Sequence, residues 1–307
     1  MKSLRIVFMG SPDFAVPSLD KLFQSSHQVV AVVSNPDKRR GRRKAPEPTA
    51  VKRRALELQL PVIDAVDLHN EALAKQLQEL KAELFVVVAF RILPDSLLKI
   101  PSIGSVNLHA SLLPRYRGAA PIHWAVINGE TETGCTTFFL DSKVDTGDII
   151  STVRTPIGPH ETTGDLYGRL KVKGAALLAE TVDQIASGSV KPVKQDDSLA
   201  TPAPKLFREN TQIDFSRPAR EVHNFVRGLN PFPGAWCLYD DLKMNIHQTI
   251  PSENLSAEPG ELIVENNRLY AGCGEEAVEL VELQLPGRKK IGGRDFANSY
   301  DTSLRLY

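Results

Sequence analysis

The stretch ELFVVVAF, Glu83 to Phe90, decides the fold class of the chain. Its apolar residues run continuously instead of alternating with polar ones, which is typical of a parallel strand that is covered on both faces. Two similar runs occur earlier, LRIVFMG from Leu4 to Gly10 and VVAVV from Val29 to Val33. Helical patterns accompany these runs, over Pro12–Phe23 and Leu68–Leu80. Strands and helices in alternation predict a doubly wound α/β domain with a mostly parallel sheet.

The composition changes near residue 190. The segment SGSVKPVKQDDSLATPAPKL, Ser187 to Leu206, is rich in proline and small polar residues, which favours an extended linker. A helical pattern from Arg217 to Leu229 is followed by five short runs with β character: AWCLYD, LKMNIHQTI, GELIVEN, RLYAGC and AVELVELQL. Such runs predict a small sandwich, or a barrel of the five-stranded oligonucleotide-binding type. We therefore expect a first domain over 1–189, a linker over 190–206 and a second domain over 207–307.

Length and composition are those of a globular protein with two domains. The chain has 307 residues, of which 42% are hydrophobic and 24% charged, and no apolar run approaches the roughly 20 residues of a membrane-spanning helix. The opening MKSLRIVFMGSPDF has too short an apolar run for a secretory signal. The three cysteines are isolated and show no zinc-binding spacing, which indicates a reducing compartment. We expect a cytoplasmic protein that has no membrane segment and is a monomer.

Charge is balanced overall but concentrated in one place. The 37 basic and 37 acidic residues give no global argument for nucleic-acid binding. The run KRRGRRKAPEPTAVKRR, Lys38 to Arg54, holds nine Lys or Arg and one Glu, so a phosphate-binding surface would centre there. A solvated flexible loop is the other interpretation of this run. Lys243, Arg288, Lys289, Lys290 and Arg294 of the second domain form either a basic groove or a spread of solvated charges.

The stretch GSVNLHASLLPRYRG, Gly104 to Gly118, carries the first catalytic candidates. If a strand ends at His109, alternation places Asn107 and His109 on one face, at the strand end where open α/β sheets bind ligands. Pro114 stiffens the loop that follows, which could present backbone groups to a planar heterocycle. The other interpretation is that both polar residues serve only as caps or turn residues.

A carboxylate completes the set. In LDSKVDTGDII, Asp145 lies in a DTGD segment that by itself is most often a plain turn. If brought beside His109, its carboxylate would favour the protonated ring. Asn107 could then donate to a developing oxyanion, which is worth ~3 kcal/mol, while His109 acts as a second donor and general acid. These groups support acyl transfer to an amine. The transfer would be direct, because Ser111 lacks the G-x-S-x-G setting and no cysteine has a visible partner base.

Two other uses of these residues have less support. A metal site built from His109, His123 and Asp145 has no HxxxH or HExxH pair behind it. His123 lies on a helical pattern in APIHWAVINGE, where packing is expected. A dinucleotide cofactor is disfavoured because FMGSPDFAV, after the first strand, lacks the G-x-G-x-x-G fingerprint.

Five motifs occur in a fixed order along the chain: VFMGSPDFAV, VNLHASLLPRYRGAAPI, VDTGDI, PKL followed by IDF, and RGLNPFPGAW. Together they resemble those of the methionyl-tRNA formyltransferase family, and the resemblance runs from Leu4 to the end of the chain. The NLH…LLPRYRG and DTG segments are similar in the wider group of 10-formyltetrahydrofolate-dependent formyltransferases. The resemblance implies a Rossmann-like domain joined to an oligonucleotide-binding-like barrel that binds tRNA. It also implies formyl transfer from N10-formyltetrahydrofolate to the α-amino group of methionyl initiator tRNA in translation initiation, without a metal.

The resemblance also implies roles for single residues. The catalytic residues would be Asn107, His109 and Asp145. The folate contacts would be Ser111, Leu112, Leu113, Pro114, Ala89, Phe90, Arg91, Ile92, Leu93 and Asp141. The tRNA contacts of a basic insertion would be Arg39, Arg40, Arg42, Arg43 and Lys44, although KRRGRRKAPEP is richer in arginine than is usual in this family.

Two alternative functions stay open at this point. One is a formyltransferase that acts on an amino sugar nucleotide, since that branch also carries a second domain. The Lys38–Arg54 charge run argues against it, because a single nucleotide-sugar does not need so many phosphate partners. The other is a non-catalytic RNA-binding protein on the same scaffold, which predicts that one of the three catalytic polar residues is missing.

Overall fold

The computed structural model describes residues 2–39 and 45–307, which form two compact units. The N-terminal unit comprises residues up to 118 with 134–155 and 168–202; the C-terminal unit comprises 119–133, 156–167 and 203–307. The change of unit at residue 203 falls inside the predicted linker. Two segments of the predicted first domain group with the C-terminal unit, since α5 (Pro121–Ile127) packs against α7 (Ala219–Gly228).

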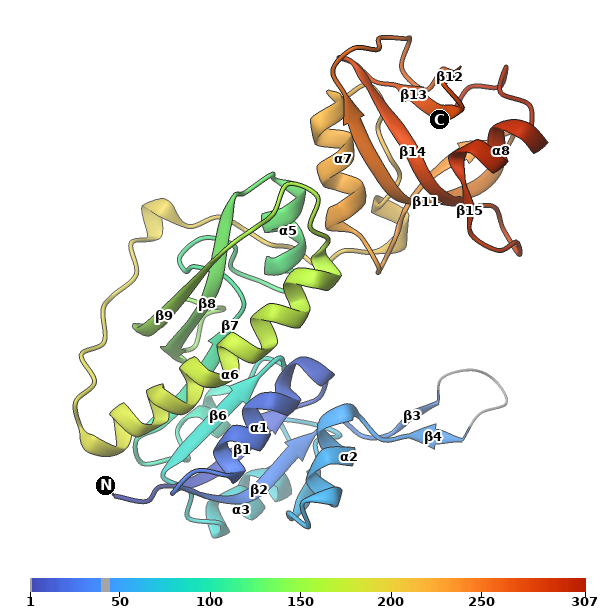
Figure 1. Cartoon of the computed structure of the whole chain (residues 1–307). Helices are drawn as coiled ribbons and strands as arrows, with labels where there is room; N and C mark the ends of the chain where they lie inside the picture. The colour runs from blue at the N-terminus through green and yellow to red at the C-terminus, as the bar shows by residue number, and fades with distance from the viewer. Residues whose placement is uncertain (1, 40–44) are drawn as a thin grey trace. The chain divides into compact units, whose positions relative to one another are not determined.

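A seven-stranded sheet forms the centre of the N-terminal unit, with the order β5-β2-β1-β6-β7-β8-β9 (Figure 1). Its strands are β1 (Arg5–Gly10), β2 (Gln28–Ser34), β5 (Val62–Asp64), β6 (Leu84–Val88), β7 (Gly104–His109), β8 (Glu132–Phe139) and β9 (Ile149–Pro156). The first five pair in parallel, and β8 runs antiparallel to β7. The chain builds outward from β1 to β5 and then returns to β6 on the other side of β1. This order confirms the doubly wound, mostly parallel sheet.

Both faces of this sheet are buried, which explains the continuous apolar runs. In β1, Ile6 and Phe8 point to one face and Val7 and Met9 to the other, and all four are fully buried. Helices and short helical turns cover the sheet: η1 (Asp13–Ala15), α1 (Val16–Phe23), α2 (Ala50–Glu57), α3 (Glu71–Glu79), α4 (Asp95–Leu98) and α6 (Thr163–Ser187). The helices α1 and α6 lie on one face (Figure 1), and α3 and α4 pack against the residues of the other.

A short hairpin and the helix α2 carry the described part of the basic run. The strand β3 (Lys38–Arg39) pairs antiparallel with β4 (Pro46–Glu47). The hairpin projects away from the seven-stranded sheet (Figure 1). The helix α2 then begins, and the hydroxyl of its N-cap Thr49 accepts a hydrogen bond from the Lys52 N–H.

The predicted linker is ordered against the N-terminal unit up to residue 202. Val193 pairs with Ile149, and Pro202 pairs with Arg117. A 3-10 turn, η2 (Asp197–Leu199), lies between these bridges. This part of the segment is a strap across the unit instead of a free tether, because its backbone and side chains find hydrogen-bond partners there.

The C-terminal unit contains an antiparallel sheet with the order β10-β11-β14-β13-β12, to which β15 adds beside β14. Its elements beyond α5 and α7 are η3 (Arg208–Asn210), β10 (Ala235–Tyr239), β11 (Leu242–Ser252), β12 (Leu262–Glu265), β13 (Arg268–Gly272), β14 (Ala277–Gln284), β15 (Ile291–Gly292) and α8 (Gly293–Ser299). The last residues bridge its edges: the Tyr307 N–H donates to the Leu238 carbonyl, and the Leu306 N–H donates to the Gly260 carbonyl. The predicted small barrel is thus closed by the end of the chain.

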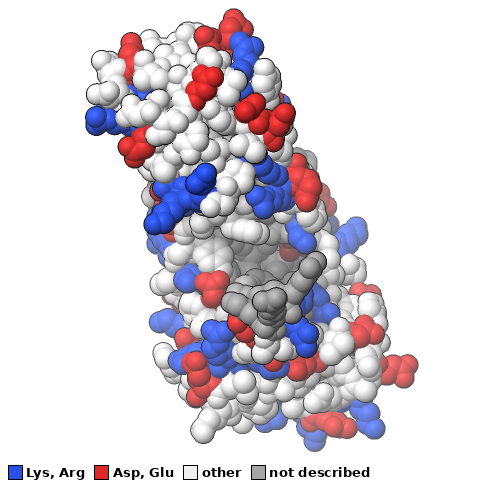
Figure 2. Space-filling model, turned by 90° about the vertical axis from the view of Figure 1, so that its right-hand side faces the viewer, with Lys and Arg blue, Asp and Glu red and all other residues white. Residues whose placement is uncertain are grey.

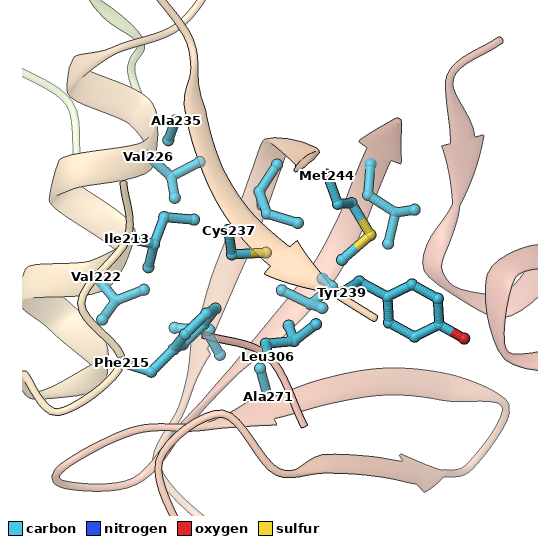
Figure 3. Packing of buried hydrophobic residues seen from close by; sticks show 14 of the residues in the cluster. Ile213, Phe215, Val222, Val226, Ala235, Cys237, Tyr239, Met244, Ala271 and Leu306 are labelled. Atoms are coloured by element: carbon cyan, nitrogen blue, oxygen red, sulfur yellow. The ribbon is translucent and has the colours of Figure 1, made fainter. Parts of the chain in front are cut away.

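The core of the C-terminal unit lies between α7 and this sheet (Figure 3). Val222 and Val226 of α7 face the strand residues Cys237 and Met244, and Tyr239 closes one end (Figure 3). Within the described chain, no helix is both long and apolar enough to span a membrane.

Candidate active site

The candidate site lies where two neighbouring parallel strands end. The strand β6 ends at Val88 and β7 at His109, and the register places Val88 beside Leu108. The carboxyl ends of parallel strands meet at one edge of a sheet, where open α/β sheets bind ligands. The predicted contact segments Ala89–Leu93 and Ser111–Pro114 therefore leave the sheet from neighbouring strand ends.

Asn107 and His109 point away from the face that α6 covers. Leu108, between them, packs against α6, where a Cβ atom added to Gly174 would lie 3.0 Å from the Leu108 side chain. Alternate strand residues point to opposite faces, so Asn107 and His109 share the other face, as the pattern predicts. Within the described chain the Asn107 carboxamide forms no hydrogen bond. This half-buried amide is available to donate to a ligand.

The two ring nitrogens of the buried His109 face different oxygens. Nε2 lies 2.8 Å from the Tyr116 carbonyl oxygen, and because a carbonyl only accepts, Nε2 carries a hydrogen. Nδ1 lies 3.7 Å from Oδ2 of Asp145, which is too long for a hydrogen bond but short enough for an ion pair. Because Nε2 is engaged with the Tyr116 carbonyl, Nδ1 is the nitrogen that can exchange a proton with a ligand, with the Asp145 carboxylate beside it.

The loop that carries Asp145 has an unusual backbone. Asp145 adopts a left-handed conformation with φ of 55°, and its Oδ2 atom accepts a hydrogen bond of 2.8 Å from the Gly118 N–H. A Cβ atom at Gly147 would lie 1.7 Å from the Phe139 carbonyl oxygen, so only glycine fits there. The DTG sequence is thus more than a plain turn, because it brings a buried carboxylate to His109.

Two predicted contact residues use their side chains inside their own loops. The Ser111 hydroxyl donates to the Arg115 carbonyl at 2.7 Å. The Asp141 carboxylate accepts hydrogen bonds from the Thr146 hydroxyl and the Lys143 N–H, at 2.8 and 2.9 Å. These side chains shape the two loops, so any ligand contact from these two residues would come from backbone groups.

The segment after β6, Ala89 to Leu93, contains both exposed residues and a residue that bonds within the protein. Ala89 is exposed and has a left-handed φ of 47°, and Ile92 is 73% exposed. In contrast, the Arg91 guanidinium donates to the Val66 carbonyl at 3.2 Å and to the Ala65 carbonyl. Ala89 and Ile92 are therefore accessible to a ligand, whereas Arg91 holds the segment in place.

Of the predicted tRNA contacts, Arg39 lies exposed on β3, while Arg40, Arg42, Arg43 and Lys44 lie outside the described residues. Two other cations of the run have internal partners. Lys52 pairs with Asp37 and Asp64, and Arg54 pairs with Asp20 and Glu57, at 2.7 to 2.9 Å. These side-chain hydrogen bonds raise the pKa of both Lys52 and Arg54. Lys52 and Arg54 are thus engaged with carboxylates inside the N-terminal unit.

Two of the second-domain cations have partners within that domain. Lys290 pairs with Glu282 at 2.7 Å, and the Lys243 ammonium lies 3.4 Å from the centre of the Trp236 ring. On the face shown in Figure 2, basic and acidic side chains are interspersed. The face shown in Figure 2 therefore has mixed charge.

The family models identify both parts of the chain. Residues 4–182 match the model described as formyl transferase, and residues 205–301 match the formyl transferase C-terminal domain. A methionyl-tRNA formyltransferase from Chlorobium limicola is 44% identical over 306 residues, covering 97% of this chain and 96% of that protein. One from Geobacter sulfurreducens is 43% identical over 298 residues, covering 96% and 94%. The chain belongs to the methionyl-tRNA formyltransferase family.

Two solved structures of lower sequence identity have the same fold. An N-formyltransferase from Helicobacter canadensis, in complex with folinic acid and dTDP-3-aminofucose, superimposes with a TM-score of 0.70 at 21% identity, covering 90% of this chain and 98% of that one. HypX from Aquifex aeolicus, in complex with tetrahydrofolic acid, gives a TM-score of 0.65 at 17% identity, covering all of this chain and 51% of that one. At these identities the likeness concerns the fold alone.

His123 and the cysteines, which were the other candidates for a metal site or a nucleophile, are buried or engaged in hydrogen bonds in this protein. The His123 Nε2 atom lies 3.1 Å from the Phe232 carbonyl oxygen, and burial lowers the pKa of His123. The three cysteines are buried, and burial raises the pKa of the Cys135 thiol to about 12, which disfavours the nucleophilic thiolate. No cluster of three His, Cys, Asp or Glu side chains suited to a metal occurs among the residues described.

Some residues around the site could not be identified from local spacing. Thr136 on β8 lies opposite His109, where its hydroxyl donates to the Ser111 carbonyl at 2.7 Å and accepts from the Leu113 N–H at 3.2 Å. Tyr116 and Gly118 act through backbone groups, which carry no side-chain signal in a sequence. Gln195 comes from the predicted linker, where the composition indicates only an extended segment.

Proposed function

We propose that this protein transfers the formyl group of N10-formyltetrahydrofolate directly to the α-amino group of methionyl initiator tRNA, for translation initiation. Full-length similarity to methionyl-tRNA formyltransferases supports the acceptor and the donor. One observation carries the chemistry. The Asn107 carboxamide has no hydrogen-bond partner among the described residues, and it lies on the same strand face as a histidine whose Nδ1 atom lies 3.7 Å from Asp145.

Asn107 and His109 act on the carbonyl of the formyl group. When the neutral amine attacks the formyl carbon, negative charge moves onto the formyl oxygen, and the Asn107 amide donates a hydrogen bond to it. The Nδ1–H group of the charged His109 ring is the second donor. As the bond between the carbon and N10 breaks, His109 gives its proton to N10 and takes one from the attacking nitrogen, so the products are N-formylmethionyl-tRNA and tetrahydrofolate.

Asp145 is the counter-ion of the His109 ring when that ring carries the proton. Its carboxylate is buried beside Nδ1 and is held by the Gly118 N–H, so it can stabilise the imidazolium without pivoting away. We also assign to Asp145 the proton that the methionyl ammonium loses before it attacks as the neutral amine, directly or through water. No covalent acyl-enzyme is required, since the amine itself is the nucleophile.

The formyl donor, N10-formyltetrahydrofolate, is held by the two segments that leave the ends of β6 and β7. We assign folate contacts to Ala89–Leu93, to Ser111–Pro114 and to the loop that starts at Asp141. The exposed Ala89 and Ile92 support this assignment, as does the internal use of the Ser111 and Asp141 side chains, which leaves backbone groups to face the pterin. The domain limits 1–189 and 207–307, a cytoplasmic location and a monomeric state belong to the same proposal.

Acceptor binding is assigned to the basic hairpin and the C-terminal unit. Arg39 is exposed on a hairpin that projects from the sheet, and the sequence places Arg40, Arg42, Arg43 and Lys44 directly after it (Figure 1). Several adjacent cations suit the repeated phosphates of a tRNA acceptor stem. A single nucleotide-sugar has too few phosphates to use them.

The deciding experiment offers two acceptors to the purified full-length protein in the presence of 10-formyltetrahydrofolate. Methionyl initiator tRNA and a dTDP-linked amino sugar are supplied separately and together, and the formylated product is identified by mass spectrometry. We expect formyl transfer to the tRNA alone. Formylation of the sugar alone would establish the amino sugar alternative, and tRNA binding without transfer to either acceptor would establish the RNA-binding alternative.

A further inference from the structure

The Gln195 carboxamide joins two loops of the candidate site. Gln195 belongs to the strap, residues 190–202, and is 6% exposed. Its Nε2 atom donates to the Asp145 carbonyl at 3.0 Å and to the Gly147 carbonyl at 2.8 Å. Its Oε1 atom accepts from Nε and Nη2 of Arg117, at 3.2 and 2.8 Å. Both ends of this amide are therefore fully used, on opposite sides.

Each side of the amide fixes one partner of His109. On the donor side lies the backbone of Asp145, whose left-handed conformation needs surrounding structure to hold it. On the acceptor side lies Arg117, which directly follows Tyr116, the carbonyl partner of the His109 Nε2 atom. The Gln195 carboxamide thus sets the distance between the Tyr116 carbonyl, which orients the His109 ring, and the Asp145 carboxylate, which lies beside its Nδ1 atom.

The strap reinforces the same turn through a second residue. The Thr201 hydroxyl accepts from the Tyr116 N–H, and the Thr201 carbonyl accepts from the Arg117 N–H, both at 2.9 Å. Asp197 adds an ion pair of 2.7 Å to Arg117, but its side chain is 76% exposed. Buried amide contacts therefore carry the positioning, while the exposed ion pair contributes little.

We propose that Gln195 is a positioning residue for formyl transfer, which acts by holding Asp145 and the Tyr116–Arg117 turn at fixed places around His109. The expected effect of Gln195 on turnover rests on the proposed function. The hydrogen bonds that Gln195 makes do not depend on it. Because a displacement of about 1 Å in a catalytic group can cost roughly a hundredfold in rate, we expect Gln195 to affect kcat more than substrate binding.

The test compares Gln195→Glu and Gln195→Met with Asp197→Asn in the full-length protein. Gln195→Glu keeps an acceptor for Arg117 but removes both donations to the Asp145 loop, while Gln195→Met removes all four hydrogen bonds at nearly the same size. Asp197→Asn removes only the exposed ion pair. The measurements are kcat and KM for methionyl-tRNA, thermal unfolding, and hydrogen exchange of the peptide that contains Gly118, followed by mass spectrometry.

Both Gln195 variants are expected to lose about ten- to a hundredfold in kcat with KM for tRNA within twofold of the wild type. The Gly118 peptide should exchange faster in both variants, because its N–H bond to Asp145 loosens, whereas Asp197→Asn should match the wild type in every measurement. Lowering the pH should partly restore the Gln195→Glu rate relative to wild type, since a protonated carboxyl can donate to one carbonyl of the loop.

The outcomes separate this inference from the proposed function. A wild-type protein without formyl transfer to tRNA would overturn the proposed function. The hydrogen-exchange data would still test whether Gln195 holds the Asp145 loop in place. An active wild type with a folded Gln195→Glu variant of normal kcat would overturn the positioning role. Equal losses in Gln195→Glu and Asp197→Asn would also overturn it, because the ion pair to Arg117 would then carry the effect.

Discussion

The Nδ1 atom of His109 lies 3.7 Å from Oδ2 of Asp145, while the same carboxylate oxygen accepts a 2.8 Å hydrogen bond from the Gly118 N–H. The carboxylate is therefore held by a backbone group and interacts with the ring mainly through charge. Asp145→Asn keeps an acceptor for Gly118 but removes that charge. We expect kcat to fall about a hundredfold with little change in thermal stability, because the imidazolium loses its counter-ion.

The matched control for this prediction is Asp148→Asn, an exposed carboxylate in the same loop. Its kcat should stay within twofold of the wild type. Steady-state kinetics with methionyl-tRNA and 10-formyltetrahydrofolate measure both variants. A normal kcat in Asp145→Asn would show that the charge beside His109 is not needed.

The unpartnered amide of Asn107 gives a second prediction. Asn107→Ala and Asn107→Asp both remove the donor to the formyl oxygen, so each should lower kcat at least a hundredfold, equivalent to ~3 kcal/mol of transition-state stabilisation. Because the amide has no partner within the described chain, Asn107→Ala should leave the Tm nearly unchanged. A large fall in Tm with normal turnover would mean that Asn107 serves folding instead of catalysis.

The basic hairpin predicts a salt-dependent effect on the acceptor. Replacing Arg39, Arg40, Arg42, Arg43 and Lys44 by Gln should raise KM for methionyl-tRNA and flatten the dependence of log KM on log salt concentration, by nearly one unit of slope for each phosphate that the variant no longer neutralises. The value of kcat should change little. Arg54→Gln is the control, because Arg54 already pairs with Asp20 and Glu57. An unchanged KM for methionyl-tRNA in the variant with all five substitutions would refute these residues as the tRNA contact.

The buried His223 predicts how stability depends on pH. Burial lowers the pKa of His223 to about 4, from an ordinary value of 6.5, and its ring lies 3.0 Å from the Thr249 hydroxyl. The unfolded chain therefore binds this proton more readily, so its contribution to stability is present above pH 6.5 and is lost as the pH falls towards 4. The full loss is at most roughly 3 kcal/mol.

Chemical denaturation of the wild type and of His223→Gln at several pH values between 7 and 4 tests this linkage. The free energy of unfolding of the wild type should fall more steeply than that of the variant over this range. Parallel curves would mean that His223 stays solvated enough to take up its proton in the folded state.

Local patterns were sufficient for much of the fold and part of the site. The uninterrupted apolar run of β6 predicted a strand buried on both faces, because a strand exposed on one face alternates. The same alternation placed Asn107 and His109 on one face of β7, since the side-chain period of two is fixed by the backbone. The motifs, in their order along the chain, were sufficient to indicate the family.

Long-range relations were not accessible in this way. The nine cations of the Lys38–Arg54 run predicted a phosphate-binding surface centred there, but Lys52 and Arg54 are paired with carboxylates from other elements. The predicted linker proved to be a strap up to residue 202, because Gln195 and Thr201 find partners in loops that are distant in sequence.

By itself, the sequence determined the alternating α/β fold, the polar pair at the end of β7 and the family. These depend on periodicity and on residues close together in the chain, where backbone geometry leaves few choices. The tertiary structure alone decided that Asp145 lies beside His109, that Gln195 joins the loops around them, and that Leu306 and Tyr307 bridge the edges of the C-terminal sheet. Each of these contacts joins segments far apart in the chain, and only the packing of the intervening elements fixes their separation.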